Sequence, residues 1–360
     1  MTSPAPYILT ARTMLPEHYY SQDELISALK DLWAARFFNL DRLERFHRNV
    51  LVGGRHMALP LDEYRQLKGL QDHNDAWIRV ATELGDKCTA AALQQADIDS
   101  GAVDLFATTS ITGLAVPSLE SRIMNRQAFR SDCKRLPLFG LGCLGGAAGL
   151  ARVADTLQGR PDQIGLLLSV ELCSLTLQQE DLSVANIVSS GLFGDGSAAV
   201  VLAGAGHQLV SGRKKTLPQI LATQSVLFPQ TERIMGWDIV DTGFKVVLDP
   251  GVPEFAERHL SGHLQALLSR HSLQINDIDV WIAHPGGPKV IDAMESGLGL
   301  AAGTLDLSRQ SLAEMGNLSS ASVLNILDRQ LEADVPAGSY GVLMAMGPGF
   351  SAEFLLLQWN

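Results

Sequence analysis

Apolar runs that are too short for a typical helix alternate along this chain with longer stretches of helical periodicity. Residues 103–108 and 164–170 are predicted to be buried strands, the second of them such a run, and residues 75–94 and 252–269 are two helix-like stretches. Strands that alternate with helices usually build a sheet with helices packed on its faces, so the sequence predicts an α/β fold. Further strands are predicted at 197–202, 280–283, 340–346 and 352–359, the last two as a hairpin around Gly347-Pro348-Gly349.

Two segments of the chain resemble each other. Residues 138–157 and 314–331 each contain a glycine, a residue with a reactive or polar side chain, small residues and then an amphipathic helix pattern, so that Gly142-Cys143 matches Gly316-Asn317. Such a repeat predicts two halves of similar design, divided near residues 204–217. We therefore expect an N-terminal half over 1–205 and a C-terminal half over 206–360.

The composition is that of a protein with a large core. The hydrophobic fraction is 46%, the charged fraction is 19% and the net charge is −11, which excludes disorder and argues against nucleic-acid binding. No membrane span and no secretory signal are visible. The four cysteines form no CxxC pair, which predicts free thiols in the cytoplasm and no zinc site. They are Cys88, Cys133, Cys143 and Cys173.

Cys143 stands out among the cysteines because it lies in a glycine-rich turn before a predicted helix. The small residues of GCLGGAAG would let that helix pack closely and leave its N-terminal N–H groups directed at the thiol. The partial positive charge of a helix N-terminus favours the thiolate, so we expect a lowered pKa at Cys143. Cys88 and Cys133 are expected to be structural, and Cys173 could line a cavity without reacting.

His284 and Asn317 are the candidate partners of this thiol. His284 follows a predicted buried strand, and Pro285, Gly286 and Gly287 then turn the chain. Residues at strand ends often form sites, although a histidine can also simply cap a turn. Asn317 precedes a predicted helix in GNLSSAS, where it could serve as an N-cap, as a catalytic group or as both.

Cysteine, histidine and asparagine together are compatible with two chemistries. The first is peptide hydrolysis of the papain kind, but the papain cysteine lies near the mature N-terminus in a sequence setting that this chain lacks. The second is decarboxylative condensation of thioesters, in which the cysteine carries an acyl group and the histidine and asparagine donate hydrogen bonds to a thioester oxygen as malonyl becomes an enolate.

Five motifs resemble those of type III polyketide synthases, the chalcone and stilbene synthase superfamily. They occur in the order typical of that family and cover nearly the whole chain. Two related families differ from this pattern. Ketoacyl-carrier-protein synthases typically have His-Gln-Ala-Asn at the histidine, where this chain has HPGGPK, and hydroxymethylglutaryl-CoA synthases use a glutamate base, for which no pattern stands out here. The motifs are GCLGGAAG around Cys143, LFGDGSAA around Phe193, WIAHPGGPK around His284, GNLSSAS around Asn317 and MGPGF at 346–350.

The resemblance implies a five-layered αβαβα thiolase-like fold with two pseudo-duplicated halves and a homodimer. It implies acyl-CoA starters, malonyl-CoA extenders, no carrier protein and no cofactor. Cys143 would be the nucleophile and acyl anchor, and His284 and Asn317 would form the decarboxylation and oxyanion pair. Phe193 matches a gatekeeper between the CoA tunnel and the cavity.

Other site residues are also implied by the resemblance. The residues near the cavity wall would be Thr109, Ser110 and Thr112. Val116 would reach into the partner's cavity. The residues that shape the cavity would be Leu177, Gly236 and Ser319. The second gate would fall near Phe244 or Lys245. The CoA phosphates would bind Arg42 and Arg45, and a third family lysine falls near Asn49, where Arg48 or Arg55 could substitute.

The apolar character of this cavity predicts which class of acyl-CoA serves as the starter. Leu177 in place of a hydroxyl-bearing residue, with the small Val116 and Gly236, favours a long alkyl chain, because each buried methylene contributes about 0.8 kcal/mol. We therefore expect an alkylpyrone or alkylresorcinol synthase. The alternatives are a malonyl-primed tetrahydroxynaphthalene synthase, which Ile111 in TTSITG weakly disfavours, a carrier-protein-dependent ketoacyl synthase and a non-catalytic thiolase-fold binding protein.

Overall fold

The computed structural model describes residues 5–36, 39–211 and 215–360. Every strand and helix predicted from the sequence is present, with ends that differ by up to five residues. The strands are β1 Tyr7–Met14, β2 His18–Ser21, β3 Gly54–Met57, β4 Leu105–Ser110, β5 Lys134–Phe139, β6 Ile164–Leu172, β7 Asp195–Ala203, β8 Pro218–Leu227, β9 Met235–Val240, β10 Gly243–Leu248, β11 Ile278–Ala283, β12 Tyr340–Gly347 and β13 Ser351–Trp359. The helices are α1 Gln22–Trp33, α2 Leu40–Asn49, α3 Leu70–Ala96, α4 Leu119–Met124, α5 Gly145–Gln158, α6 Val184–Leu192, α7 Gln208–Ser211, α8 Val252–Ser269, α9 Pro288–Leu298, α10 Asp306–Met315 and α11 Ser320–Glu332.

Nine strands form the main sheet, in the order β11-β12-β13-β8-β1-β7-β6-β4-β5. The two parts of this sheet are joined by a single β1–β8 residue pair, Tyr7 with Gln219. In the first part, the pairs β1–β7, β7–β6 and β6–β4 are antiparallel, antiparallel and parallel. In the second part, β8–β13, β13–β12 and β12–β11 repeat that sequence of directions.

This repetition agrees with the internal similarity in the sequence, because α5 precedes β6 in one part as α11 precedes β12 in the other. The expected boundary between 205 and 206 falls in the connection from β7 to β8, of which residues 212–214 lie outside the described residues. The division of the chain into two folding units stays a prediction.

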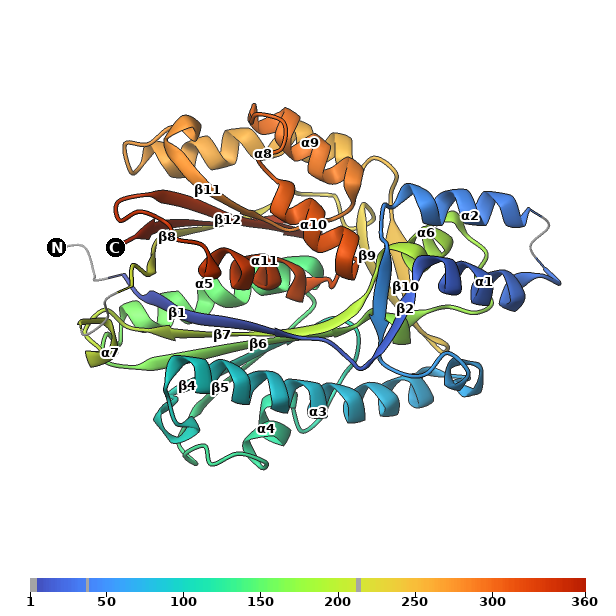
Figure 1. Ribbon diagram of the computed structural model, residues 1–360, viewed down its shortest axis with the longest axis horizontal. Helices are drawn as coiled ribbons and strands as arrows, with labels where there is room; N and C mark the ends of the chain where they lie inside the picture. The colour runs from blue at the N-terminus through green and yellow to red at the C-terminus, as the bar shows by residue number, and fades with distance from the viewer. Residues whose placement is uncertain (1–4, 37–38, 212–214) are drawn as a thin grey trace.

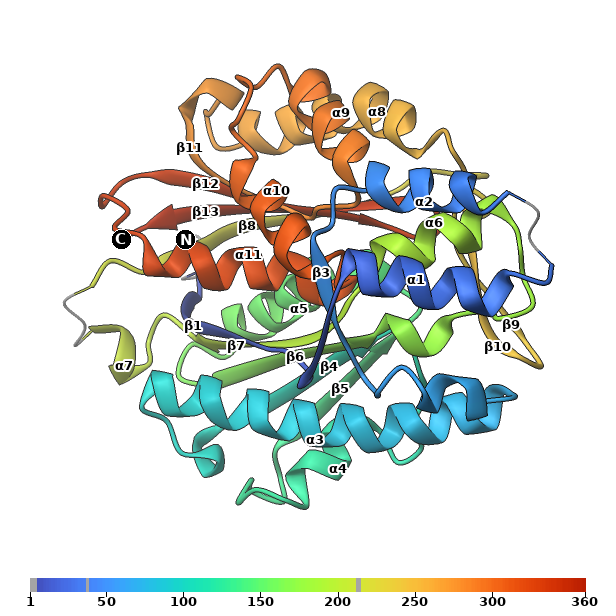
Figure 2. The ribbon, with the colours of Figure 1, turned by 45° about the vertical axis from the view of Figure 1, so that its right-hand side comes forward.

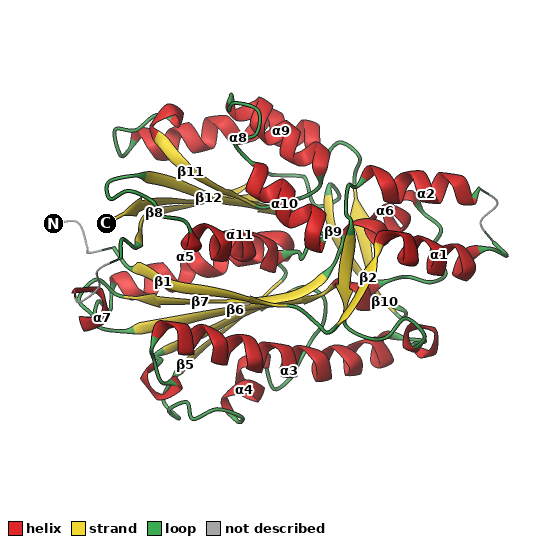
Figure 3. Cartoon of the chain, viewed as in Figure 1, coloured by secondary structure: helices red, strands yellow, loops and turns green. Residues whose placement is uncertain are grey.

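Helices and sheets alternate in five layers (Figure 1). Helices α3 and α4 cover the outer face of the first part of the sheet, α5 and α11 lie between the two parts, and α8 and α9 cover the outer face of the second part. Figure 3 shows the same alternation with helices and strands in separate colours. The predicted five-layered α/β fold is confirmed.

The middle layer depends on glycines that allow α5 and α11 to approach closely. A Cβ atom on Gly145 would lie 2.4 Å from the Thr109 hydroxyl oxygen, and one on Gly146 would lie 2.1 Å from the carbonyl oxygen of Ser320. Larger residues would therefore push the two helices apart. Because Cys143 and Asn317 precede these helices, their close packing places both residues in one region.

A smaller group of elements covers one end of the layers. Helices α1, α2 and α6 and the β9–β10 hairpin gather on the right of Figure 1, and the turned view in Figure 2 shows α1, α2 and α6 together at that end. Strands β6 and β11 finish toward this end, so the loops that follow them meet beneath the cover. Within the described ranges, no helix is long and apolar enough to cross a membrane.

Candidate active site

Cys143 lies in a single 3₁₀ turn, Gly142–Leu144, directly before α5. Gly142 has φ +51°, and a Cβ atom there would lie 2.6 Å from Pro348, so the turn needs glycine at this position. The Cys143 thiol donates a hydrogen bond to the Ser319 hydroxyl oxygen over 3.6 Å. Ser319 is expected from the sequence to be a cavity serine. The structure brings it into contact with the nucleophile, but it is not among the residues that line the cavity around Cys143.

Asn317 lies between α10 and α11 and is held by both backbone and side chain. Its N–H donates to the Leu192 carbonyl oxygen at 2.9 Å, and its Oδ1 accepts the Ser319 N–H at 2.8 Å. Its Nδ2 donates to the Gly286 carbonyl oxygen at 3.4 Å. A side-chain amide has two N–H donors, so this bond leaves a second one for a ligand.

His284 directly follows β11, as the sequence predicts. Its N–H donates to the Met344 carbonyl oxygen at 2.9 Å, and its own carbonyl accepts the Gly286 N–H at 3.1 Å. Burial lowers the pKa of the imidazole to about 3, so the ring is neutral near pH 7. Its Nδ1 has no hydrogen-bond partner among the described residues.

One cavity of about 840 Å³ brings Cys143, His284 and Asn317 together. Phe193 and Gly236 also line it, as expected for the gate and for the elongation space. Most of the remaining wall is apolar. Its apolar members include Val50, Leu51, Val184, Val188, Leu192, Met235, Trp237, Val246, Leu248, Val252 and Met346.

The expected lowering of the Cys143 pKa is wrong. Burial raises the pKa of the thiol to about 12, and the nearby Glu171 carboxyl raises it further, while the hydrogen bond to Ser319 lowers it only in part. The desolvation of this half-buried thiolate at the cavity wall thus outweighs the favourable helix N-terminus. In the free protein Cys143 is a neutral thiol.

A pH profile of alkylation tests this property of Cys143. Because the thiolate is the reactive form and its pKa is raised, the rate of iodoacetamide modification at Cys143 should rise by about tenfold per pH unit from pH 7 to 9. Peptide mass spectrometry at each pH measures the rate, and a Cys143→Ala sample corrects for the other three cysteines. A rate that is already constant below pH 7 would show a lowered pKa instead.

Glu171 is a site residue that the sequence reasoning did not single out. This carboxyl lies inside β6, in which every residue is buried. It accepts hydrogen bonds from the hydroxyls of Ser110, Thr112 and Ser320 and from the Ile111 N–H. A glutamate within an otherwise apolar strand is the signal that could have identified it, since buried carboxyls require such partners.

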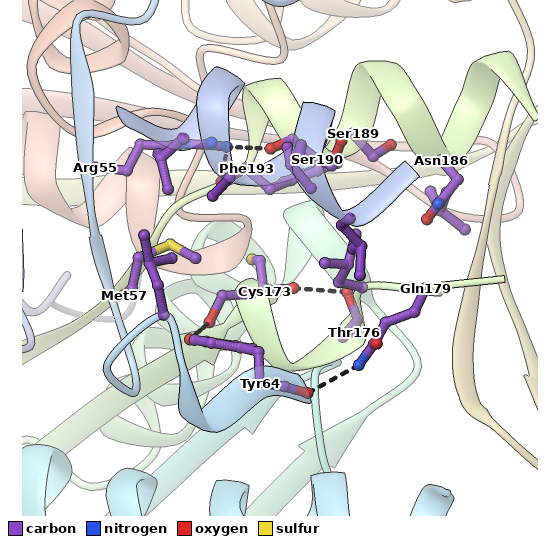
Figure 4. A pocket seen from close by; sticks show the side chains of 18 of the residues that line it. Arg55, Met57, Tyr64, Cys173, Thr176, Gln179, Asn186, Ser189, Ser190 and Phe193 are labelled. Carbon is purple, nitrogen blue, oxygen red and sulfur yellow. Dashed lines mark hydrogen bonds between the residues drawn. The ribbon is translucent and has the colours of Figure 1, made fainter. Parts of the chain in front are cut away.

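A second cavity of about 340 Å³ (Figure 4) shares the lining residues Phe193, Trp237 and Val246 with the first. Leu177 lines this smaller cavity and not the one that contains Cys143, which corrects its expected position. Cys173 also lines it, as anticipated, and burial raises its pKa well above the usual range. Val116 lies on the surface with 96% of its area exposed.

Three residues expected at the cavity wall occupy other places. Ser110 and Thr112 turn toward Glu171 instead, and Thr109 packs against the position of Gly145 at the start of α5. None of the three is among the residues that line the catalytic cavity or the smaller one. The buried carboxyl of Glu171 explains the difference for Ser110 and Thr112. Its oxygens are removed from water and require hydrogen-bond donors, and these two hydroxyls supply them.

Neither residue near which the second gate was expected, Phe244 or Lys245, lines the catalytic cavity or the smaller one. Phe244 is buried outside both cavities, Lys245 forms an ion pair with Asp181 at 3.2 Å, and Val246 lines both cavities. The structure thus gives Val246, an aliphatic side chain, the position at the cavity.

The arginines expected to bind CoA phosphates lie on α2 beside the catalytic cavity. Arg42 and Arg45 are exposed, and one turn along the helix Phe46 and Asn49 line the cavity. Lys289, which the sequence reasoning did not assign, is an exposed cation in the same cavity lining. Among the residues with described positions, no three His, Cys, Asp or Glu side chains come together in a way that could hold a metal ion.

Comparisons with known proteins agree with this arrangement. Residues 219–359 match the C-terminal domain of chalcone and stilbene synthases, and residues 71–225 match the FAE1/type III polyketide synthase-like family. A 1,3,6,8-tetrahydroxynaphthalene synthase of Streptomyces peucetius subsp. caesius is 46% identical over 98% of this chain and 93% of that protein. A putative chalcone synthase of Bacillus subtilis (strain 168) is 36% identical over 98% and 99%. The crystal structure of a 1,3,6,8-tetrahydroxynaphthalene synthase from Streptomyces coelicolor A3(2) has a TM-score of 0.91 at 31% identity, covering 98% of this chain and 99% of that one.

Proposed function

This chain belongs to the type III polyketide synthases of the chalcone and stilbene synthase superfamily, and we propose that its starter is a medium- to long-chain fatty acyl-CoA. The family consists of acyltransferases that condense malonyl-CoA. The proposed products are alkylpyrones or alkylresorcinols. The observation that supports this starter class is the large, mostly apolar cavity that contains Cys143, because an alkyl chain gains free energy for each methylene that it buries there.

Starter loading begins with attack of the Cys143 sulfur on the acyl-CoA thioester. The thiol is neutral, so its proton must leave as the carbon–sulfur bond forms. With a pKa of about 3, the imidazole of His284 in the same cavity cannot remove this proton beforehand and accepts it only as that bond forms. The carbon–sulfur bond to coenzyme A then breaks, and its thiolate takes the proton. The acyl group remains on Cys143.

Extension uses hydrogen-bond donors more than a base. Malonyl-CoA loses carbon dioxide, and the electron pair of the broken carbon–carbon bond becomes an enolate whose oxygen accepts hydrogen bonds from His284 and the free N–H of Asn317. A neutral imidazole is suited to this role because it carries a donor without a full charge. The enolate carbon attacks the acyl carbonyl and releases Cys143.

A second candidate is malonyl priming with a tetrahydroxynaphthalene product. It is supported by the 46% identity to the Streptomyces peucetius synthase, whose named product, 1,3,6,8-tetrahydroxynaphthalene, has no alkyl chain. A starter without an alkyl tail would leave most of the apolar wall around Cys143 without a partner. The geometry therefore favours the fatty acyl starter, and the relative favours malonyl.

Product analysis separates the two candidates. The enzyme is incubated with malonyl-CoA alone and with malonyl-CoA plus acyl-CoAs of increasing length, and the products are identified by mass. We expect products that retain the alkyl chain, with kcat/KM that increases with starter length. A single product from malonyl-CoA alone, with no incorporation of any acyl chain, would support malonyl priming and contradict the fatty acyl starter.

We also propose a homodimer and a CoA phosphate site at α2. The edge strand β5 and the exposed side chains of Phe139 and Val116 support the dimer, since a free sheet edge with apolar neighbours favours pairing with a second copy. Sedimentation measures the oligomeric state directly.

Arg42 and Arg45 lie where they could bind anionic phosphates, and a raised KM for malonyl-CoA in their alanine variants would support that role.

A further inference from the structure

The backbone of Asn317 is joined to the C-terminal end of α6. Its N–H donates to the Leu192 carbonyl oxygen at 2.9 Å, and its carbonyl oxygen accepts the Gly194 N–H at 3.0 Å. These two bonds accompany the isolated β-bridge between Phe193 and Asn317. The direction in which the Asn317 amide points into the catalytic cavity therefore depends on where residues 192–194 lie.

Arg55, on β3, binds the same end of α6 through its guanidinium group (Figure 4). Its Nη1 donates to the carbonyl oxygens of Ser190 and Phe193 at 2.7 and 2.8 Å. Carbonyl groups in the last turn of a helix lack partners within it and carry a partial negative charge, so a cation stabilises them. One nitrogen atom thus holds the last turn of α6 together with the residue that follows it.

The aliphatic part of Arg55 lies against the glycine that precedes Asn317. A Cβ atom on Gly316 would lie 3.0 Å from Cδ and 3.1 Å from Cγ of Arg55, and 2.8 Å from the Leu192 carbonyl oxygen. Gly316 also has φ +72°, a conformation that favours glycine. Arg55 therefore contacts both sides of the bridge, residues 190–193 through its guanidinium and Gly316 through its methylenes.

Arg55 keeps its charge although only 2% of its area is exposed. Burial lowers the pKa of the guanidinium to about 10, and the nearby Asp195 carboxyl offsets part of this effect, so the group is protonated near pH 7. Its Nε is covered by protein and has no hydrogen-bond partner among the described residues. This setting does not fit the CoA phosphate role that the sequence left open for Arg55, because its Nη1 is bound to backbone carbonyls.

We propose that Arg55 is a positioning residue for decarboxylation, which holds the end of α6 and Gly316 so that the free N–H of the Asn317 amide is directed at the enolate oxygen. This inference rests on the proposed role of Asn317 as an enolate donor. Arg55 is not among the residues that line the cavity around Cys143, so it acts through Asn317 and touches no reacting atom. Without the guanidinium, two carbonyl oxygens lose their donor, and the segment that holds Asn317 can shift.

Decarboxylation and starter loading, measured separately in Arg55→Met, test this role. Methionine removes the guanidinium and keeps an unbranched apolar chain against Gly316. We expect kcat for malonyl-CoA decarboxylation to fall by about 10²-fold, the cost of misplacing a reacting group by about 1 Å, with little change in KM. Acylation of Cys143 in the absence of malonyl-CoA should stay near the parent rate, because the Asn317 amide takes no part in it.

Gln22→Met is the matched control for Arg55→Met. Gln22 is also buried, and its side-chain amide also donates to a carbonyl oxygen at the end of α6, that of Gly191, at 3.1 Å. Its other acceptor is the His47 carbonyl oxygen at 2.9 Å, and neither acceptor belongs to the bridge with Asn317. Decarboxylation by Gln22→Met should therefore stay near the parent rate. A loss as large as that in Arg55→Met would assign the effect to α6 as a whole and overturn the inference.

Double variants test whether Arg55 acts through Asn317. Asn317→Ala removes the amide without adding a charge, so in that background Arg55→Met should cause little further loss of decarboxylation. In the His284→Ala background, which retains Asn317, Arg55→Met should still cause a loss near that in the parent. Equal losses in the Asn317→Ala and His284→Ala backgrounds would overturn the inference.

Arg55→Lys keeps the test decisive if Arg55→Met fails to fold, which would show as a loss of acylation at Cys143. A lysine ammonium has three N–H donors, so it can bind two carbonyl oxygens from one nitrogen, as Nη1 does. Its loss of decarboxylation should be smaller and should also disappear in the Asn317→Ala background. A parent-like rate in Asn317→Ala alone would instead contradict the proposed role of Asn317, so the two failures are distinguishable.

Discussion

Replacing Cys143 with alanine is expected to reduce polyketide formation to the uncatalysed background. The thiol is the only group of the catalytic set that can hold the acyl chain between loading and extension, and alanine leaves no atom to form the thioester. The substitution is small, and only one weak hydrogen bond, to Ser319, is lost. The fold should therefore be retained, and product formation from an acyl-CoA and malonyl-CoA is measured by chromatography.

Decarboxylation provides the internal control for Cys143→Ala. His284 and Asn317 remain in the same cavity, so the variant should still release carbon dioxide from malonyl-CoA while it forms no condensed product. Cys133→Ala is the matched cysteine control, since Cys133 lies outside both cavities, and should behave like the parent. Polyketide formation near the parent rate in Cys143→Ala would refute the assignment of the nucleophile.

Replacing either enolate donor is expected to have the next largest effect. His284→Ala and Asn317→Asp should each lower malonyl-CoA decarboxylation by about 10²–10³, the usual cost of losing one oxyanion donor. Asn317→Asp keeps an oxygen that can accept the Ser319 N–H at 2.8 Å. It removes the N–H donors and also brings a negative charge and a second oxygen toward the Gly286 carbonyl oxygen, so both changes oppose the enolate. Release of labelled carbon dioxide measures the rate.

The two donor variants should differ in starter loading. Asn317→Asp should still form the acyl-enzyme, whereas His284→Ala should also load slowly because the neutral imidazole accepts the thiol proton. The imidazole pKa of about 3 predicts that decarboxylation is not lost through His284 as the pH falls from 8 to 5, since the ring protonates only below that range. His271→Ala, at an exposed position after α8, is the control. Near-normal decarboxylation in either donor variant would contradict the roles of His284 and Asn317 as enolate donors.

The sequence predicts those parts of the fold in which local signals agree with the final packing. Residues 164–170 are apolar except for Ser169 because β6 is buried on both faces, and the hairpin of β12 and β13 has its turn at residues 348–350. Strand β5 was not predicted, since it lies at a sheet edge and alternates between exposed and half-buried residues. Helix α8 was predicted with both of its ends.

The sequence predicts those residues of the candidate site that lie in a recognisable local motif. Cys143, His284 and Asn317 each stand in a glycine-rich turn after or before a regular element, and the structure places all three in one cavity. The pKa of Cys143 could not be predicted from its turn, because burial is a property of the whole neighbourhood. The same is true of the position of Leu177, which depends on how α1, α6 and the β9–β10 hairpin pack together.

The most direct measurement is the identity of the residue that carries the acyl group. The enzyme is incubated with a fatty acyl-CoA in the absence of malonyl-CoA, digested, and analysed by peptide mass spectrometry. We predict a single acyl adduct on the peptide that contains Cys143, and no adduct on that peptide in Cys143→Ala. An acyl group found on Cys173 or another residue, with Cys143 unmodified, would contradict the central claim.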